Sequence, residues 1–277
     1  MGKNKLVAPV LKWVGGKRQL IAQITELLPS SYATYYEPFI GGGAVFFHLQ
    51  HKKVVINDFN SELVNVYKTI QSDVEGLIED LKKHKNESDY FYEIRALDRS
   101  DGFDKLTNVE KASRIIYLNK TCFNGLYRVN SSGEFNTPFG RYKNPNIVNE
   151  ITLRAVHKYL TTNNITILNQ DFETIFDNIK KNDFVYLDPP YDPVSKSSNF
   201  TGYNQGGFST DDQVRLRELC DKLNKKGVKF LLSNSATDFI KEEYKDYQIN
   251  IVQANRSINS NAKKRGAVDE VLIRNYE

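Results

Sequence analysis

The apolar run Phe184–Leu187 ends abruptly at Asp188-Pro189-Pro190-Tyr191, and this boundary constrains the fold more than any other feature of the sequence. Proline fixes its backbone φ angle and has no N–H, so two consecutive prolines end a strand and leave nearby carbonyls free to accept hydrogen bonds. Open α/β sheets bind ligands at the carboxyl ends of buried strands. We therefore predict a strand at 184–187 followed by a ligand-binding turn, the alternative being an ordinary turn with a chance acid and tyrosine.

Strand-like and helix-like segments alternate along most of the chain. Short apolar runs predict strands at 35–37, 54–56, 165–168, 184–187, 228–232, 247–252 and 270–274. Apolar residues at helical spacing, with capping residues at their ends, predict helices at Lys17–Leu28, from Asn60 to roughly Lys83, and from Ser209 to Gly227. The pattern indicates an α/β fold, a mostly parallel sheet flanked by helices with the last two strands as an antiparallel edge.

The middle of the chain, residues 85–160, differs in character from the segments on either side. Between 111 and 158, eight lysines and arginines stand against two glutamates, a net charge of +6 compared with +4 for the whole chain. The cations are Lys111, Arg114, Lys120, Arg128, Arg141, Lys143, Arg154 and Lys158, and the aromatic residues among them are Phe123, Tyr127, Phe135, Phe139 and Tyr142. We interpret 85–160 as an insert with a nucleic-acid-binding surface, the alternative being a merely solvated basic face.

Length and composition fit a globular chain with a large core. The 277 residues are 40% hydrophobic and 26% charged, and no apolar run approaches the roughly 20 residues that cross a bilayer. The apolar stretch at the start is too short for a signal peptide. The two cysteines, Cys122 and Cys220, lie far apart, which favours a reducing cytoplasmic location over a disulfide framework. His48 and His51 lack partner ligands nearby, so we expect no metal site.

A glycine-rich turn follows the strand predicted at 35–37. In Glu37–Gly43 three consecutive glycines let a ligand approach the backbone where a helix begins. Asp58 ends the next strand, where a carboxylate suits ribose hydroxyls. Dinucleotide-binding folds use the same device, but their Gly-x-Gly-x-x-Gly pattern is absent and Glu37 would repel a pyrophosphate. A nucleoside that carries positive charge, such as S-adenosylmethionine, fits this turn better.

Six motifs occur together in a fixed order: Lys12–Lys17, Glu37–Gly43, Asn57–Asn60, Phe123–Arg128, Phe135–Tyr142 and Asp188–Tyr191. This order resembles that of the Dam-type DNA adenine methyltransferases, in particular the subgroup with the GATC-modifying methylases of bacterial restriction–modification systems. The resemblance extends from about Lys12 to the C-terminus. It implies a Rossmann-like methyltransferase sheet formed by 1–84 and 161–277 and a helical and hairpin DNA target-recognition module at 85–160.

The resemblance further implies that S-adenosyl-L-methionine is the methyl donor, that S-adenosyl-L-homocysteine is the product, and that no metal takes part. The residues implied to surround the donor are Trp13, Lys17, Glu37, Phe39, Gly41, Asp58, Asp171 and Phe172, the last two beside its adenine.

For the chemistry, the resemblance implies that the target adenine leaves the DNA helix at a cost of a few kcal/mol and stacks on Tyr191. Asp188 and the carbonyl of Pro189 would accept the two hydrogens of the exocyclic amine and align its nitrogen with the methyl group. A carboxylate with a pKa of about 4 is too weak a base to deprotonate an aromatic amine, so proton loss should follow methyl transfer.

For DNA reading, the resemblance implies that Lys12 contacts the first guanine of GATC, Arg128 the guanine of the last pair, and Leu126 with Pro138 the thymine methyl. Phe123 would fill the gap left by the flipped base, where family members commonly have tyrosine, with Asn124 beside the orphaned thymine. The residues expected on the rest of the DNA-binding surface are Arg141, Tyr142, Lys143, Arg256, Lys263, Lys264 and Arg265, the cations binding phosphates.

Three alternatives remain open on the sequence. The same turn chemistry serves methylation of cytosine N4 or of adenine in RNA; an NAD-dependent oxidoreductase shares the architecture; and a DNA-binding regulator could have lost catalysis. We expect double-stranded DNA as the partner and no association with a membrane. We also expect a possible functional pairing with a restriction endonuclease, and a monomer or weak dimer.

Overall fold

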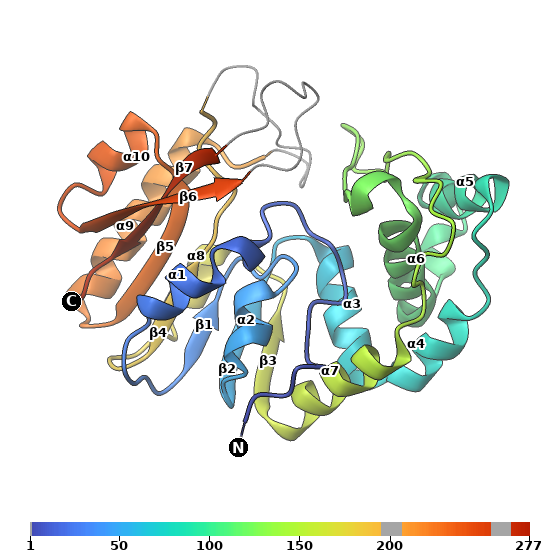
Figure 1. Cartoon of the computed structure of the whole chain (residues 1–277), viewed down its shortest axis with the longest axis horizontal. Coiled ribbons are helices and arrows are strands. Elements are labelled where there is room, and N and C mark those ends of the chain that lie inside the picture. The colour runs from blue at the N-terminus through green and yellow to red at the C-terminus, as the bar shows by residue number, and fades with distance from the viewer. Residues whose placement is uncertain (1, 195–206, 256–266) are drawn as a thin grey trace.

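The computed structural model describes residues 2–194, 207–255 and 267–277 (Figure 1). Within these ranges seven strands form one sheet in the order β3-β2-β1-β4-β5-β7-β6. The strands are β1 Tyr35–Glu37, β2 Lys53–Asn57, β3 Asn164–Leu168, β4 Phe184–Leu187, β5 Lys229–Ser235, β6 Gln248–Asn255 and β7 Ala267–Arg274. Every strand expected from the sequence is present, which confirms the predicted α/β class.

The sheet combines a parallel and an antiparallel part. Strands β1 to β5 pair in parallel, so their carboxyl ends meet at one edge. Strand β7 lies antiparallel between β5 and β6 and pairs with both, which confirms the antiparallel end of the sheet. All four side chains of β4 are fully buried, as expected for a strand covered on both faces.

The helices connect these strands as the alternation predicts. They are α1 Ile21–Glu26, α2 Ala44–Leu49, α3 Ser61–Ser72, α4 Val74–Leu81, α5 Ser88–Ala96, α6 Asn108–Thr121, α7 Glu150–Thr162, α8 Phe172–Phe176, α9 Thr210–Lys225 and α10 Asp238–Glu243. Single 3₁₀ turns cover Lys17–Gln19, Leu97–Arg99, Phe103–Lys105 and Phe123–Gly125. The predicted caps of α9 are confirmed: Ser209 and Asp212 form a capping box, and Gly227 follows the helix at φ +69°.

The expectation of one long helix from Asn60 to about Lys83 was wrong. Asn60 does cap α3, accepting a hydrogen bond from the Leu63 N–H. The helix stops at Asp73, whose backbone leaves the helical region (φ −149°, ψ 69°) and whose carboxylate accepts from the Gly76 N–H to start α4. Aspartate competes with helical backbone bonds in this way, whereas apolar spacing continues unbroken across the junction.

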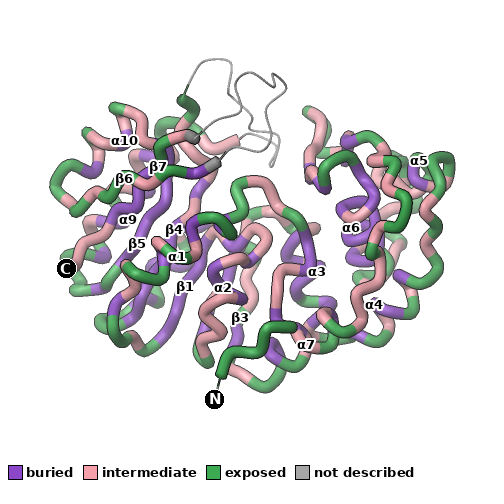
Figure 2. The backbone as a smooth tube through the Cα atoms, in the orientation of Figure 1, coloured by how far each residue is buried: buried purple, intermediate pink, exposed green. Residues whose placement is uncertain are grey.

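Alternating side chains of the strands face two separate layers of helices. On one face Tyr35, Tyr186 and Leu231 pack with side chains of α2, α3 and α6. On the other face Tyr36, Val185 and Leu232 pack with α8 and α9. Figure 2 shows the buried strands between these layers. Helices therefore cover both faces of the sheet, and ligands have access at the carboxyl ends of the parallel strands.

The helices α4, α5 and α6 lie to one side of the sheet (Figure 1). A capping box between Thr107 and Glu110 starts α6. Arg114 of α6, counted from the sequence as part of a basic surface, is only 1% exposed. Its guanidinium binds Glu62 at 3.2 Å and Asp98 at 2.7 Å. Arg114 therefore joins the insert to the start of α3 and does not belong to a DNA-binding face.

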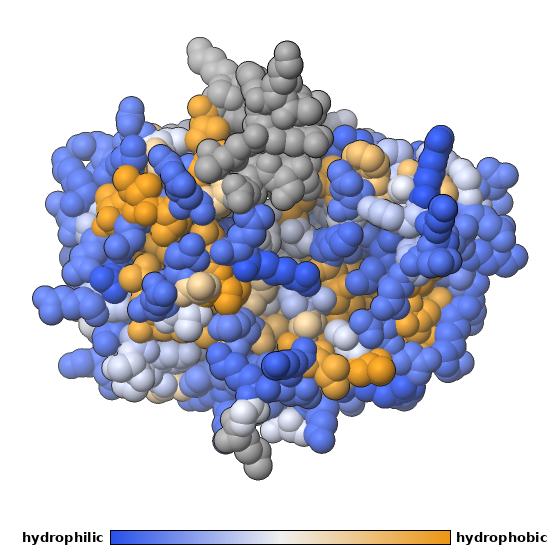
Figure 3. All heavy atoms as spheres, in the orientation of Figure 1, coloured by the Kyte–Doolittle hydropathy of each residue, from blue (hydrophilic) through white to orange (hydrophobic). Residues whose placement is uncertain are grey.

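The rest of the expected basic and aromatic surface is also partly structural. Tyr127 and Phe135 are buried, whereas Phe123 is 54% exposed. Arg154 pairs with Glu75 and Glu150 on the surface of α7. Sequence spacing cannot separate buried from exposed members of such a run, because buried residues of the insert, such as Tyr127 and Phe135, join the same hydrophobic core as the sheet. Hydrophilic side chains nevertheless cover most of the face in Figure 3.

Candidate active site

Asp188 follows β4 directly, at the edge where the parallel strands end. The Lys17 ammonium lies 2.7 Å from the Asp188 Oδ1 atom and donates to the Gly15 carbonyl at 2.6 Å. The same nitrogen lies 4.6 Å from the centre of the Tyr191 ring. Lys17 is only 5% exposed. The turn after β4 thus holds a buried amine against one carboxylate and one aromatic face.

Burial raises the pKa of Asp188 to about 6, with Lys17 opposing the shift and Glu270 adding to it. The next carboxylate along the strand ends, Glu37 of β1, accepts a hydrogen bond from the Tyr35 hydroxyl. Burial, reinforced by the charge of Asp188, raises the pKa of Glu37 well above its usual range. This edge therefore carries two neighbouring acids with raised pKa values, the buried Glu37 and the half-buried Asp188, an arrangement common at functional sites.

A network of amide and hydroxyl groups fixes the backbone of this turn. The Gln213 amide donates to the Pro190 carbonyl at 2.9 Å and accepts from Asn234 at 3.1 Å. Asn234 accepts from the Asp192 N–H at 3.0 Å, and the Ser235 hydroxyl donates to the Asp192 carbonyl at 2.5 Å. The sequence analysis missed Gln213 and Asn234. The available signal was the polar run Ser233–Ser235 that ends an otherwise apolar buried strand.

The glycine-rich turn packs against Trp13. Gly41 has φ +48°, and a Cβ atom there would lie 3.0 Å from the Trp13 ring, so this position requires glycine. The Gly41 N–H donates to the Asp58 carboxylate at 3.0 Å, and the Tyr67 hydroxyl donates to the Gly41 carbonyl at 2.9 Å. Burial raises the pKa of Asp58 to about 6, while backbone N–H donors lower it. Trp13, Gly41 and Asp58 thus lie together, as the sequence predicted.

Asn57, which the sequence analysis quoted only as part of a motif, ties three strand ends together. Its amide nitrogen donates to the carbonyls of Pro38 and Gln170, and its oxygen accepts from the Gln170 N–H. These bonds connect the segments after β1, β2 and β3. They hold Asp58 and the start of α8 in a fixed relation.

Aromatic side chains line the far end of this edge. Phe39 lies 5.3 Å from Phe172 and 5.9 Å from Phe208, measured between ring centres. The Arg215 guanidinium lies 4.5 Å from the Phe172 ring and 2.9 Å from the Asp171 carboxylate. Asp171 also caps α8 through the Glu173 N–H. Phe39, Asp171 and Phe172, predicted as one group, are brought together, and Phe208 and Arg215 join them.

The residues expected to read DNA lie on the insert and on the segment before Trp13. The Lys12 backbone is held by the Asn119 side chain, and its ammonium lies 5.7 Å from the Tyr142 ring centre. Gly125, at φ +64°, makes room for Lys12, since a Cβ atom there would lie 2.5 Å from its Cδ atom. The first and fourth motifs are therefore in direct contact.

The segment 122–139 folds back on itself through bridges between Cys122 and Phe139 and between Val129 and Phe135. The sequence placed a hairpin at Asn124–Arg128, but Asn124 lies in the 3₁₀ turn Phe123–Gly125 and the chain reverses further along, near 130–134. Asn124 adopts a left-handed conformation at φ 57°. The Arg128 guanidinium donates to the side chain and backbone oxygens of Asn136 at 2.6 and 3.1 Å. Arg128 is thus held in one orientation.

The remaining residues expected at the DNA surface differ in exposure. Pro138, Arg141 and Lys143 are exposed, and Leu126 and Tyr142 are half-buried. Arg141 has φ 53°. The other expected phosphate contacts fall outside the described residues: Arg256, Lys263, Lys264 and Arg265.

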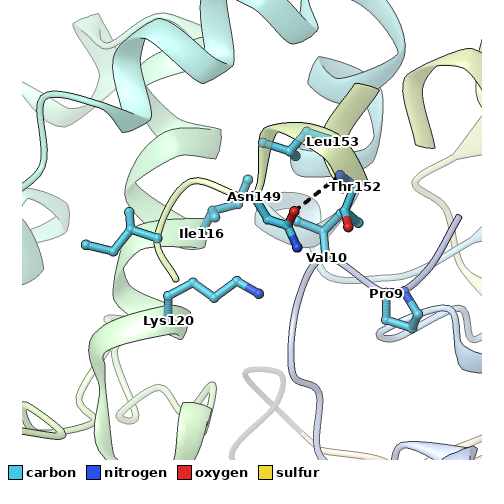
Figure 4. Close-up of a pocket in the computed structure, with 8 residues that line it drawn as sticks. Pro9, Val10, Ile116, Lys120, Asn149, Thr152 and Leu153 are labelled. Atoms are coloured by element: carbon cyan, nitrogen blue, oxygen red, sulfur yellow. Dashed lines mark hydrogen bonds between the residues drawn. The ribbon is translucent and has the colours of Figure 1, made fainter. Parts of the chain in front are cut away.

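Two cavities have linings that include none of the predicted site residues. Figure 4 shows the smaller, about 20 Å³ in volume, between α6, the start of α7 and the N-terminal segment; Val10, Lys120 and Thr152 line it. It has room for about one water molecule and not for a nucleoside. A larger cleft of about 530 Å³ opens between the start of α3 and the insert, and its lining includes Phe59 and Glu134. The candidate site is the group of side chains at the strand ends, around Asp188, Gly41 and Asp58.

Among the residues that the structure describes, no helix combines the length and apolarity needed to cross a membrane. In the same ranges, no cluster of three or more His, Cys, Asp or Glu side chains is arranged to hold a metal ion. Cys122 and Cys220 are both buried and unbridged.

Comparison with known proteins assigns the chain to a family. Residues 13–258 match the family described as D12 class N6 adenine-specific DNA methyltransferase. The type II methyltransferase M1.LlaDCHI of Lactococcus lactis subsp. cremoris is 47% identical to the chain, covering 99% of it and 98% of that protein. The type II methyltransferase M.MjaIII of Methanocaldococcus jannaschii is 44% identical, covering 98% and 99%. A DNA adenine methylase of Haemophilus influenzae is 35% identical, covering 95% and 92%. The chain therefore belongs to the D12 class of N6-adenine-specific DNA methyltransferases.

Proposed function

We propose that this enzyme transfers a methyl group from S-adenosylmethionine to the N6 amine of a flipped adenine within GATC in double-stranded DNA. The observation that carries the proposal is the turn Asp188–Tyr191, in which a half-buried carboxylate and an aromatic face already hold an amine, that of Lys17. A target adenine presents the same two features to the enzyme, an amino group and a flat ring.

The residues at the strand ends fit S-adenosylmethionine. The donor combines a positively charged methionine part with a nucleoside, and the edge offers the carboxylates of Glu37 and Asp58 together with a backbone that Gly41 leaves open. The rings of Phe39 and Phe172 suit a flat base. When bound, the donor supplies an electrophilic methyl group. Trp13, Lys17 and Asp171 complete the proposed binding set.

In the proposed mechanism the chain's own groups prepare the amine. Asp188 and the Pro189 carbonyl accept the two amine hydrogens, which stabilises the positive charge that develops on nitrogen during transfer. Lys17 favours the ionised form of Asp188 and thereby keeps it an acceptor. Tyr191 supports the ring and fixes its angle, so the amine is aligned before reaction. The proton leaves after transfer, because neither acceptor is a strong base.

Sequence reading is assigned to the insert, residues 85–160, with catalysis in 1–84 and 161–277. In this proposal the cations of Lys12 and Arg128 bind the two guanines of GATC, and Leu126 and Pro138 contact the thymine methyl. Support comes from Arg128, which Asn136 holds in a defined orientation. Phe123, whose side chain is 54% exposed, would enter the gap left by the flipped base with Asn124 beside it.

The biological setting is part of the proposal. Two relatives at high identity are named type II methyltransferases, which supports pairing with a restriction endonuclease. We propose that the enzyme acts in the cytoplasm, where its DNA substrate lies, as a monomer or weak dimer.

The test is transfer of labelled methyl from S-adenosylmethionine to matched duplexes. The set contains GATC, each one-base variant, GATC already methylated on both strands, a cytosine-rich duplex without adenine in the site, and an RNA of the same sequence. We expect uptake only by unmodified GATC, with label on adenine N6. Equal uptake by the one-base variants would overturn the GATC assignment, and label on cytosine or RNA would replace the substrate.

A further inference from the structure

Glu270 is a buried acid beside the catalytic turn that neither the motifs nor the proposed mechanism uses. It lies in β7 opposite Ser235 of β5, and it is 9% exposed. The Tyr191 hydroxyl donates to its Oε2 atom at 2.9 Å. A residue near the end of the chain thus contacts the ring that is proposed to carry the target base.

Burying the Glu270 carboxylate costs free energy, so its presence at this position calls for a reason. Taking a carboxylate out of water is unfavourable unless hydrogen bonds or a cation compensate for the lost hydration. Within the described residues Glu270 forms no ion pair, and its side chain accepts a hydrogen bond from the Tyr191 hydroxyl. An apolar residue would suit the pattern better, because Val271, Leu272 and Ile273, which follow in the same strand, are fully buried.

Two sets of contacts therefore fix Tyr191. Its backbone lies between Pro190 and Asp192, which the amides of Gln213 and Asn234 hold. Its ring is held at the far end, where the hydroxyl meets Glu270. With the Cα end and the hydroxyl both fixed, the tilt of the ring has little freedom, and a stacked base would inherit that tilt.

We propose that Glu270 is a positioning residue, which accepts the Tyr191 hydroxyl hydrogen bond and so sets the angle at which the target adenine stacks. This inference rests on the proposed role of Tyr191 as the stacking surface. It predicts that Glu270 acts only through the hydroxyl, and it assigns the buried carboxylate a role in the rate of methyl transfer and none in cofactor or DNA affinity.

The test is a double-mutant cycle with Glu270→Ala and Tyr191→Phe, in which Tyr191→Phe keeps the ring and removes only the hydroxyl. A hydrogen bond to a charged acceptor is worth enough to slow single-turnover methylation about tenfold when either partner is removed. The double variant should be no slower than the slower single variant, because both changes remove the same bond. Glu270→Gln, whose amide oxygen still accepts, should stay within about threefold of the native rate.

Two further readouts separate positioning from damage to the fold. The Kd for DNA and for S-adenosylmethionine should stay unchanged in all four proteins. A duplex with 2-aminopurine at the target position should fluoresce more with Glu270→Ala than with the native enzyme, because a flipped base that stacks poorly is less quenched. Asp269→Ala, an exposed change in the same strand, is the matched control and should leave every quantity unchanged.

Each failure has its own meaning. If Tyr191→Ala retains the native rate, the proposed role of Tyr191 fails. If Tyr191→Ala is slow but the rate losses of Glu270→Ala and Tyr191→Phe multiply in the double variant, Glu270 does not act through Tyr191 and the inference is overturned. A Glu270→Gln protein slowed about tenfold or more relative to the native enzyme, or Tyr191→Phe at the native rate, overturns it equally, and neither measurement requires a folded Glu270→Ala protein.

Discussion

The turn after β4 differs from the segment 122–139 of the insert in how far the surrounding side chains are buried. Around the turn, Gln213, Asn234 and Ser235 are at most 2% exposed and bind the backbone on both sides of Tyr191. In the insert, Phe123 is 54% exposed and Asn124 lies at positive φ. One region is fixed from behind by buried partners, while the other presents side chains outward.

The difference fits the two roles proposed for these regions, catalysis at the turn and sequence reading in the insert. Chemistry on a base requires acceptors that already point to the amine, so reorganisation must be small and the supporting groups buried. Reading DNA requires side chains that reach base edges and phosphates from the protein surface. We therefore expect changes in the first region to alter rate, and changes in the second to alter the choice of sequence or the affinity. Four experiments test that division.

The largest effect is expected for Asp188→Ala. Loss of a preorganised acceptor should lower the methylation rate by about 10³-fold or more, with DNA affinity retained. Single-turnover transfer and DNA titration measure the two quantities. Asp238→Ala, on the fully exposed start of α10, is the control. A variant with native turnover would remove Asp188 from the mechanism.

Arg128→Ala should change discrimination and leave the chemistry on GATC largely intact. Loss of a cation that reads guanine should relax selectivity at the outer pair by roughly 1–3 kcal/mol. Ratios of kcat/KM for GATC and outer-pair variants measure this. Asn136→Ala, which only frees the guanidinium, should have a smaller effect in the same direction. Unchanged ratios in Arg128→Ala would show that another residue reads this pair.

The pH dependence of the rate should follow Asp188, whose pKa burial raises to about 6. Below that pH the carboxyl group binds a proton and ceases to accept from the amine, so the single-turnover rate should fall about tenfold by pH 5. The contribution to stability has the opposite sign. Since the folded pKa exceeds the unfolded value of about 4, this group's contribution to the free energy of unfolding decreases as pH rises from about 4 to 6.

The measurement uses saturating donor and DNA, because Asp58 also has a pKa of about 6 and its protonation is expected to weaken donor binding. Lys17→Met removes the cation that lowers the pKa of Asp188 and should move the midpoint of the rate upward. A rate that stays constant down to pH 5 in the native enzyme would contradict the assignment of Asp188 as a charged acceptor.

The smallest effect is expected for Lys143→Ala. An exposed cation that binds one phosphate should, when removed, weaken all sequences by a similar few-fold factor and reduce the slope of log Kd against log salt by about 0.9. Titrations of GATC and unrelated duplexes at several salt concentrations measure this. Lys245→Ala, at an exposed position just after helix α10, is the control. A loss confined to GATC would make Lys143 a base reader.

The sequence predicted the sheet and the turn after β4 because both depend on residues close together in the chain. Two prolines end β4, and glycines with positive φ mark the turn after β1. The break at Asp73 escaped notice because apolar spacing continues across it. Local patterns also could not show that Arg114 is buried, since its partners Glu62 and Asp98 lie in distant segments.

The supporting residues of the active site were the hardest to foresee. Gln213 of α9 and Asn234 of β5 can bind the backbone of the turn only because the fold places these two elements beside it. Glu270 looked like an ordinary member of a terminal strand. Such contacts join residues far apart in the chain, so no window of the sequence contains both partners.

The place of β7 inside the sheet affects how the enzyme is made. The strand lies between β5 and β6 although it is synthesised after both of them. A ribosome that has completed Lys17, Asp188 and even β6 still lacks strand β7, which carries Glu270, and Tyr276 just after it, whose hydroxyl donates to the Leu27 carbonyl at 2.7 Å. Domains fold as units once their chain has emerged. The working enzyme should therefore arise only after β7 has been synthesised, and a chain that stops before β7 would modify DNA poorly.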